Sequence, residues 1–229
     1  MKAVFLDAGG VLYRRERHYR HLLAFLGRQQ LPLPSPSELR RIRAEIKSQR
    51  PGASRSVRHD AFLAVLGVFD LDPVRQAEGR RVLAQESAEI TLFPGVAETL
   101  RALAARGFKL GVITNTTTPT AQKRRWLQSC GVDVPWDSFV SSCEVGVAKP
   151  HPRIYEIALA QCAVAPAEGV FVGHDATELA GARAVGLKTV GFDCGADARA
   201  DDFIVEFADL LELPYLRNGS VRRSNETRH

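Results

Sequence analysis

The chain has 229 residues, a formal net charge of +5, and 45% apolar and 25% charged residues, a composition typical of an ordinary globular protein. It contains no uninterrupted apolar run of about 18 residues, so we expect no membrane span. Its 4 cysteines form no CxxC pair and show no metal-ligand spacing, which favours reduced thiols and a cytoplasmic location.

The first predicted strand, Ala3–Leu6, runs directly into a carboxylate and a glycine-rich turn. Asp7 follows the strand, and Gly9 and Gly10 come just after it. A carboxylate held at a rigid strand end can act as a nucleophile. Two adjacent glycines allow a tight turn that brings main-chain groups close to a ligand. Taken singly, an Asp in this place is more often a turn or helix cap.

The next stretch, residues 14–90, shows helical patterns and no convincing strand. Its apolar residues recur at helical spacing, and the sequence LPLPSPS at 31–37 is typical of a joint between helices. The predicted apolar stripes are Leu22, Leu23, Phe25 and Leu26, then Leu39, Ile42 and Ile46, then Phe62, Leu63, Val65 and Leu66. We therefore predict an all-helical cap domain, residues 14–90, inserted after the first strand.

The positive charge is concentrated in this cap. Twelve Arg or Lys residues against three Glu lie between Arg14 and His59. Such an excess favours an anionic partner, although a solvated helix face explains it equally well. Because no zinc finger, RNA-binding motif or basic heptad repeat accompanies the charge, we expect no nucleic acid partner.

The remainder of the chain alternates strand and helix. Helical spacing covers residues 94–107, 150–162 and 177–185. The further predicted strands are Lys109–Thr114, Ser138–Ser141, Val170–Gly173, Lys188–Phe192 and Phe203–Val205. This alternation predicts an α/β fold, a Rossmann-like parallel sheet with helices on both faces, built from residues 1–13 and 91–216. Residues 217–229 are polar and are predicted to form a flexible tail.

Polar side chains follow successive strands of this predicted sheet. Besides Asp7, they are Thr114, Asn115, Lys149, His174, Asp175 and Glu178. Ligands of parallel sheets bind beyond the carboxyl ends of the strands, so we expect these residues to share one site. A hydroxyl and a lysine can hold the oxygens of a transferring phosphoryl group, and acids can hold Mg²⁺.

Four segments resemble the motifs of the haloacid dehalogenase-like hydrolase superfamily. They are FLDAGGVL, GVITNT, VGVAKPHPRIYEIAL and VFVGHDATELAGARAVGLKTV, and the helical insertion matches the family's cap. The resemblance implies that Asp7 is the nucleophile and that Thr114 and Lys149 bind phosphate and stabilise charge. We expect Gly9, Gly10 and Asn115 to contribute to phosphate binding as well.

The resemblance also implies Mg²⁺ as cofactor, because most members of the family are Mg²⁺-dependent phosphatases. The metal would be held by Asp7, by the main-chain carbonyl of Gly9 and by an acid of the fourth motif. That motif reads Gly173-His174 here, and imidazole is a poor Mg²⁺ ligand. Asp175 is the candidate replacement for His174, with Glu178 supporting the ligands.

A second departure from the family pattern is Gly9, which replaces the usual acid/base Asp. Loss of such a group typically slows a reaction by ~10²–10⁴-fold. Some family members with Gly in this place are nevertheless sugar-phosphate phosphatases, because a leaving group of low pKa needs less protonation. We therefore expect a phosphatase acting on a small anionic metabolite such as a sugar phosphate.

Two alternatives remain open at this stage. Without the second Asp and the usual fourth-motif Asp, the chain could be a weakened or inactive protein that binds a phosphorylated ligand or a partner. A 2-haloacid dehalogenase also lacks the second Asp and needs no metal. That branch, however, carries an aromatic residue where this chain has Gly9. The sequence leaves the oligomeric state open.

Overall fold

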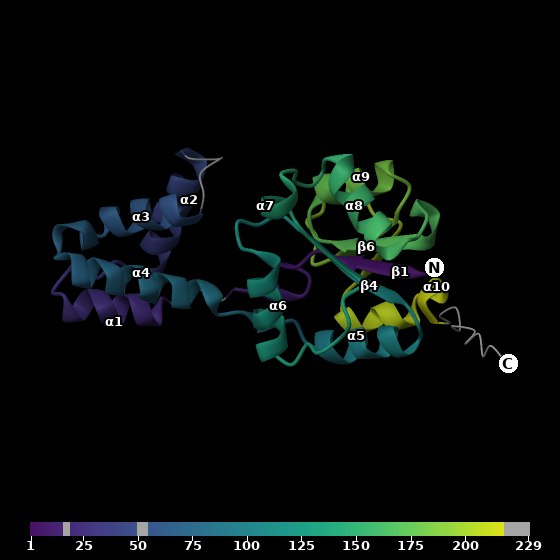
Figure 1. Ribbon diagram of the computed structural model, residues 1–229, viewed down its shortest axis with the longest axis horizontal. Coiled ribbons are helices and arrows are strands. Elements are labelled where there is room, and N and C mark those ends of the chain that lie inside the picture. The colour runs from purple at the N-terminus through teal and green to yellow at the C-terminus, as the bar shows by residue number, and fades with distance from the viewer. Residues whose placement is uncertain (16–18, 50–54, 218–229) are drawn as a thin grey trace, which may run out of the picture. The chain divides into compact units, whose positions relative to one another are not determined.

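A computed structural model describes residues 1–15, 19–49 and 55–217. Six strands form one parallel sheet in the order β5-β4-β1-β6-β7-β8 (Figure 1). They are β1 (Ala3–Leu6), β4 (Lys109–Thr114), β5 (Ser138–Ser141), β6 (Gly169–Gly173), β7 (Lys188–Phe192) and β8 (Asp202–Ile204). The predicted parallel sheet is confirmed; β6 begins one residue earlier than predicted, and β8 is shifted by one residue toward the N-terminus.

Helices cover both faces of this sheet. The helix α8 packs on β4 and β5 and α9 on β6 and β7, while α5 lies against β4 from the other face (Figure 1). The helices of this part are α5 (Val96–Ala105), α6 (Thr120–Ser129), α7 (Ser142–Val145), α8 (Pro152–Cys162), α9 (Ala176–Ala184) and α10 (Pro214–Arg217), with 3₁₀ turns at Pro166–Glu168 and Phe207–Glu212. Helix α5 begins after the predicted Pro94, because Gly95 has a left-handed φ of 77°.

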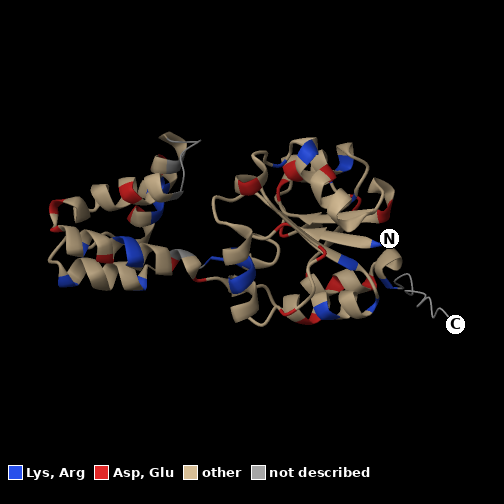
Figure 2. Cartoon of the chain, in the orientation of Figure 1, with Lys and Arg blue, Asp and Glu red and all other residues tan. Residues whose placement is uncertain are grey.

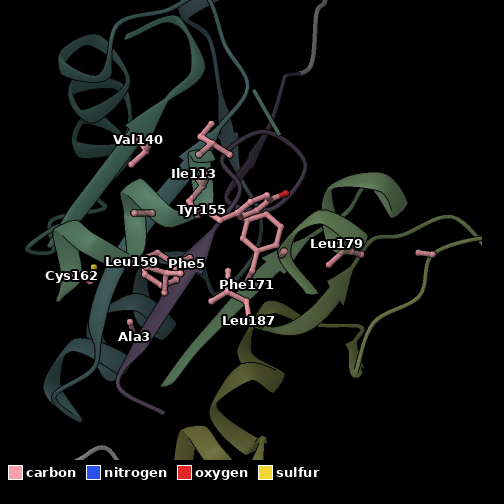
Figure 3. Packing of buried hydrophobic residues seen from close by; sticks show 14 residues of the cluster. Ala3, Phe5, Ile113, Val140, Tyr155, Leu159, Cys162, Phe171, Leu179 and Leu187 are labelled. Carbon is pink, nitrogen blue, oxygen red and sulfur yellow. The ribbon is translucent and has the colours of Figure 1, made fainter. Parts of the chain in front are cut away.

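The core on the α8 and α9 face is built by alternate residues of the strands. Ala3 and Phe5 of β1 point to this face together with Phe171 of β6, as the period of two in a strand requires. Tyr155 of α8 packs edge-on against Phe171, with ring centroids 5.5 Å apart (Figure 3). Its hydroxyl donates to the main-chain carbonyl of Glu178 at 2.6 Å, so this core also holds the start of α9.

The chain folds as two units, each packed mainly on itself. One comprises Met1–Arg14 and the chain from Thr91 onward, and the other is Arg15–Ile90. A short antiparallel pair that the sequence did not predict, β2 (Tyr13–Arg14) with β3 (Thr91–Leu92), belongs to the first unit and ends where the helical unit begins. The predicted tail 217–229 lies outside the described residues except for Arg217, which ends α10.

The second unit consists of helices around their own apolar core. These are α1 (Arg20–Arg28), α2 (Pro36–Gln49), α3 (Arg55–Val65) and α4 (Pro73–Ala88), with a 3₁₀ turn at Val68–Asp70. The predicted apolar stripes supply Leu22, Phe25, Leu39 and Phe62 to this core. Val65, a predicted member of the third stripe, is instead 61% exposed at the end of α3.

The basic charge of the helical unit is partly balanced within it. Arg28 pairs with Glu78 of α4 at 2.8 Å, and Arg80 of α4 pairs with Asp60 of α3 at 2.8 Å. Figure 2 accordingly shows acidic and basic residues interspersed on these helices. Between Asp60 and Ile90 the sequence has six Asp or Glu and three Arg, so the later part of the unit offsets only part of the excess before His59. No helix of the described residues combines the length and apolarity needed to cross a bilayer.

Gly181 lets α9 approach the chain directly after Lys149. A Cβ at this position would lie 2.7 Å from the carbonyl oxygen of Pro150 and 2.7 Å from its Cβ. Real Cβ atoms do not approach backbone so closely, so any side chain here must displace the helix or the Lys149–Pro150 segment.

We predict that Gly181→Ala lowers the free energy of unfolding by about 1–3 kcal/mol, the cost of overpacking. The sign of this change in the free energy of unfolding distinguishes overpacking from an ordinary helix substitution, because Gly→Ala inside a helix normally stabilises by about 0.5–1 kcal/mol. Gly27→Ala in α1 is the matched control, since its Cβ would meet only Leu33 at 3.9 Å and should stabilise. Urea unfolding of both variants measures the effect, and stabilisation by Gly181→Ala would show that the close approach is absent.

Candidate active site

The site lies at the carboxyl ends of three neighbouring strands. Asp7 follows β1, Thr114 ends β4, and His174 follows β6, which are adjacent in the order β4-β1-β6. Parallel strands present their carboxyl ends at one edge, so residues that are far apart in the sequence meet there. Lys149 and Glu178 come from the α7–α8 connection and from α9.

A buried ammonium joins two carboxylates at the centre of the site. Lys149 Nζ lies 2.7 Å from Asp7 Oδ1 and 2.7 Å from Glu178 Oε2. The side chain of Lys149 is fully buried, and those of Asp7 and Glu178 are only 7% and 13% exposed. Ala8 N also donates to Asp7 Oδ1, at 2.7 Å. Charges withdrawn from water in this way persist only when they are paired, and the ammonium provides that pairing.

Asn115 fixes the lysine in this position. Its Nδ2 donates to Lys149 O at 2.9 Å and to Glu178 Oε1 at 3.0 Å, and its Oδ1 accepts from Lys149 N at 2.8 Å. One amide therefore connects the end of β4, the lysine loop and α9. This network makes Asn115 a residue that positions Lys149, and its contact with phosphate stays a prediction.

His174 contacts the other oxygen of Asp7. Its Nδ1 lies 3.3 Å from Asp7 Oδ2. The imidazole packs directly over Gly10, where a Cβ would come within 2.7 Å of the ring and where φ is +86°. Gly10 is therefore required both by the turn and by the ring above it. Gly9 has open space by comparison, since its Cβ would meet only Tyr13 Cε2 at 3.9 Å.

Thr114 is buried and interacts with a lysine that the sequence did not single out. Lys123 of α6 donates to Thr114 Oγ1 at 2.9 Å and to Tyr13 OH at 3.1 Å, and its side chain is also buried. Because this bond uses Oγ1 as an acceptor, the hydroxyl hydrogen of Thr114 is left for another acceptor, as a phosphate oxygen would be. The signal was present in the sequence, because Lys123 shares the helical face of the buried Trp126 and Leu127.

Asp175 caps α9. Its Oδ1 accepts from Thr177 N at 2.9 Å, from Thr177 Oγ1 at 2.6 Å and from Glu178 N at 3.1 Å. This is the ordinary role of an Asp before a helix. Its assignment as a metal ligand stays a prediction, and this oxygen already has three donors.

The electrostatics keep the central carboxylate ionised. Burial opposes the charge on Asp7, but Lys149 and His174 outweigh it and hold the pKa of Asp7 below its ordinary value. Burial raises the pKa of Glu178, and although Lys149 opposes this, Asp7 adds to it. The interaction with Asp7 raises the pKa of His174. At neutral pH Asp7 is therefore an ionised carboxylate at a strand end.

The donors around Asp7 do not form an ordinary Mg²⁺ site. Mg²⁺ requires oxygen ligands at about 2.0–2.1 Å in octahedral geometry. Asp7 Oδ2 faces an imidazole nitrogen, Glu178 is held by Lys149 and Asn115, and Asp175 caps a helix. Among the described residues, no group of three or more His, Cys, Asp or Glu side chains is arranged to hold a metal ion.

Fold and site together define a doubly wound α/β protein with a carboxylate–ammonium centre at the carboxyl edge of its sheet. A family model described as haloacid dehalogenase-like hydrolase matches residues 1–186. The chain belongs to the haloacid dehalogenase-like hydrolase family, and the resemblance of its four motifs is thereby confirmed.

Curated relatives include enzymes of two kinds. A phosphoglycolate phosphatase of Yersinia pestis is 33% identical over 140 residues, covering 57% of this chain and 60% of that protein. A glyceraldehyde 3-phosphate phosphatase of Pyrococcus furiosus is 35% identical over 141 residues, covering 59% and 58%. An (S)-2-haloacid dehalogenase of Burkholderia cepacia is 30% identical over 131 residues, covering 57% and 55%. The chain thus spans less than two thirds of the length of these relatives.

Solved structures agree on the fold across nearly the whole chain. A phosphatase of this family from Thermococcus onnurineus has a TM-score of 0.65 at 25% identity, covering 93% of this chain and 97% of that one. A 2-haloacid dehalogenase from Pseudomonas syringae has a TM-score of 0.67 at 23% identity, with the same coverage. The fold is therefore common to both kinds of enzyme.

We predict that Lys149→Met lowers the free energy of unfolding by about 3–5 kcal/mol, because it leaves two buried carboxylates without their cation. Burial then raises the folded-state pKa of Asp7 above its unfolded value. A carboxyl shifted upward stabilises the fold at low pH and loses this contribution as the pH rises. The loss should therefore be larger near about pH 8 than near about pH 4.

Lys2→Met is the matched control for this experiment. Lys2 pairs with Glu168 at the surface, where an ion pair contributes about 0–1 kcal/mol. Denaturant unfolding at both pH values measures each variant. A loss for Lys149→Met that is small, or that does not depend on pH, would contradict the central role of the ammonium.

Proposed function

We propose that this protein is a phosphatase in which Asp7 accepts the phosphoryl group of a small phosphate monoester. The observation that supports this most directly is the contact between ionised, buried Asp7 and the fully buried ammonium of Lys149. A nucleophile and a cation for the transferring group are thereby held together at a strand edge. Thr114, whose hydroxyl hydrogen is free to donate, supplies a further contact to phosphate.

The reaction would proceed in two displacements at phosphorus. An oxygen of Asp7 forms a bond to phosphorus while the bond to the leaving oxygen breaks, which gives an aspartyl-phosphate and releases an alkoxide that takes a proton from water. Water then attacks phosphorus and restores the carboxylate of Asp7, with release of inorganic phosphate. Lys149 and Thr114 hold the phosphoryl oxygens through both steps.

The proposed substrate is a small phosphorylated metabolite. Two of the relatives named above are phosphatases of phosphoglycolate and of glyceraldehyde 3-phosphate, both short monoesters, and sugar phosphates are the natural extension of this class. A panel of such monoesters, assayed for phosphate release with and without divalent ions, tests the class. The donors beside Asp7 do not suit Mg²⁺, the cofactor that the family implies, so neither displacement depends on the ion.

A dehalogenase is the second candidate, and one observation favours it. Asp7 is surrounded by nitrogen donors and lacks a second carboxylate at position 9, and attack at a carbon–halogen bond needs neither a general acid nor a metal. Halide release from 2-chloropropionate, measured beside phosphate release from the monoester panel, separates the two reactions.

We predict that Asp7→Asn abolishes phosphate release, because an amide oxygen cannot form the aspartyl-phosphate. The variant keeps the size of the side chain, so circular dichroism should still report a folded protein. Asp133→Asn, at an exposed position, is the control and should keep the activity. Turnover by Asp7→Asn at a rate near that of the original protein would refute Asp7 as the nucleophile.

We predict that Gly9→Asp raises kcat on substrates with poor leaving groups by up to ~10²-fold, because it restores a general acid. The position has room, since a Cβ there meets only Tyr13 at 3.9 Å. Gly9→Asn is the matched control, equal in size without the acid, and should give no gain. The measurement is the dependence of rate on leaving-group pKa, which should become shallower in the Asp variant only; equal slopes would show that the missing acid does not limit the rate.

A further inference from the structure

His174 occupies the side of Asp7 that faces away from Lys149. The two cationic or N–H donors divide the carboxylate between them, with Lys149 Nζ at 2.7 Å from Oδ1 and His174 Nδ1 at 3.3 Å from Oδ2. An ionised carboxylate can only accept hydrogen bonds. Both of its oxygens are thus directed at nitrogen.

The position of the hydrogen on the imidazole decides which ring nitrogen of His174 could bind a metal. Two acceptors placed face to face would repel, so the nitrogen that faces ionised Asp7 is the one that bears a hydrogen. Nδ1 with its hydrogen has no lone pair to offer a metal beside Asp7, and the other ring nitrogen, Nε2, packs against Gly10. The imidazole therefore faces Asp7 with an N–H at ion-pair distance, and it fills the space beside Oδ2 in which a divalent ion would share that oxygen.

The ring lies against the main chain of the Gly10 turn. It packs on Gly10 so closely that even a Cβ there would lie 2.7 Å from Cε1 and 2.7 Å from Nε2. β1 and β6 are neighbours in register, Leu6 opposite Val172, so Asp7 and His174 follow from strands that are hydrogen-bonded to each other. The pairing of the two strands therefore brings Asp7 and His174 close together.

The nearby acids do not replace the missing ligand. Glu178 is held by the ammonium of Lys149 at 2.7 Å and by the amide of Asn115 at 3.0 Å. Asp175 accepts three hydrogen bonds at the start of α9. Withdrawing Glu178 toward a metal would break its contacts with Lys149 and Asn115, and Asp175 is tied to the start of α9 through its Oδ1.

We propose that this site binds the phosphoryl group without a divalent ion, and that His174 takes the place of the metal as the donor beside Asp7. The inference deepens the proposed phosphatase function and rests on it. His174 and Lys149 would then bracket the reacting carboxylate and supply hydrogen bonds to the phosphoryl oxygens. The ligand is an oxyanion of the phosphate class, so inorganic phosphate is the appropriate probe.

Calorimetry on the full chain tests this without any turnover. Wild-type protein is titrated with MgCl₂, and separately with inorganic phosphate in EDTA and in excess Mg²⁺. We expect no saturable Mg²⁺ binding, and the same phosphate affinity in both buffers. In His174→Asn phosphate should bind about tenfold more weakly in EDTA, the loss of one charge-assisted hydrogen bond.

We expect the variant His174→Asp to change the site into one that binds Mg²⁺. An added carboxylate beside Asp7 provides a second oxygen ligand, so Mg²⁺ should now bind and phosphate should bind at least about tenfold more tightly with Mg²⁺ than with EDTA. His151→Asp is the matched control. It makes the same substitution at an exposed position before α8, where Asp can cap the helix as His151 does, and it should gain no Mg²⁺ binding.

Three results with wild-type protein would overturn the proposal, so it does not depend on the folding of any variant. They are saturable Mg²⁺ binding, phosphate binding that requires Mg²⁺, and no phosphate binding in either buffer. Failure of the phosphatase function itself looks different: no monoester is hydrolysed, while phosphate still binds equally in both buffers. The two failures are therefore distinguishable.

Discussion

The site depends on one buried ammonium shared by two carboxylates. Lys149 has no exposed side-chain surface and lies 2.7 Å from both Asp7 and Glu178. Without it, both acids would be driven toward the neutral form by burial, and Asp7 could not be the ionised group that a nucleophile must be. The same ion pairs also tie β1, the α7–α8 connection and α9 to one another, so stability and chemistry have a common origin.

Contacts of three further residues hold that ammonium in place. Asn115 bonds the main chain of Lys149 on both its N–H and its carbonyl side. Gly181 allows α9 to lie against Pro150, and Tyr155 reaches from the apolar core to the carbonyl of Glu178. The packed face of the sheet thereby extends to the edge where the reactive groups lie. A rigid core of this kind is what allows a site to be held without a ligand present.

Two departures from the family pattern both remove a carboxylate from the surroundings of Asp7. Gly9 removes a carboxylate from the first motif, and His174 removes one from the fourth and introduces a nitrogen donor. Together they change the surroundings of Asp7 from acidic groups that would gather a cation to donors that would gather an anion. In the proposed phosphatase reaction, these N–H donors would take the place of a divalent ion beside Asp7.

The sequence by itself determined the six strands of the parallel sheet and the family, because apolar runs and glycine-marked turns are local patterns that can be read from the sequence alone. It did not predict the short β2–β3 pair. It also marked Asp7, Thr114 and Lys149, since strand ends in a parallel sheet share an edge. Only the tertiary structure decided what these groups touch. It placed His174 against Asp7, turned Asp175 into a helix cap and brought Lys123 to Thr114. Such contacts form between side chains that are distant in the sequence. The packing of the elements and the orientation of the side chains decide which groups meet, and no local sequence pattern encodes either.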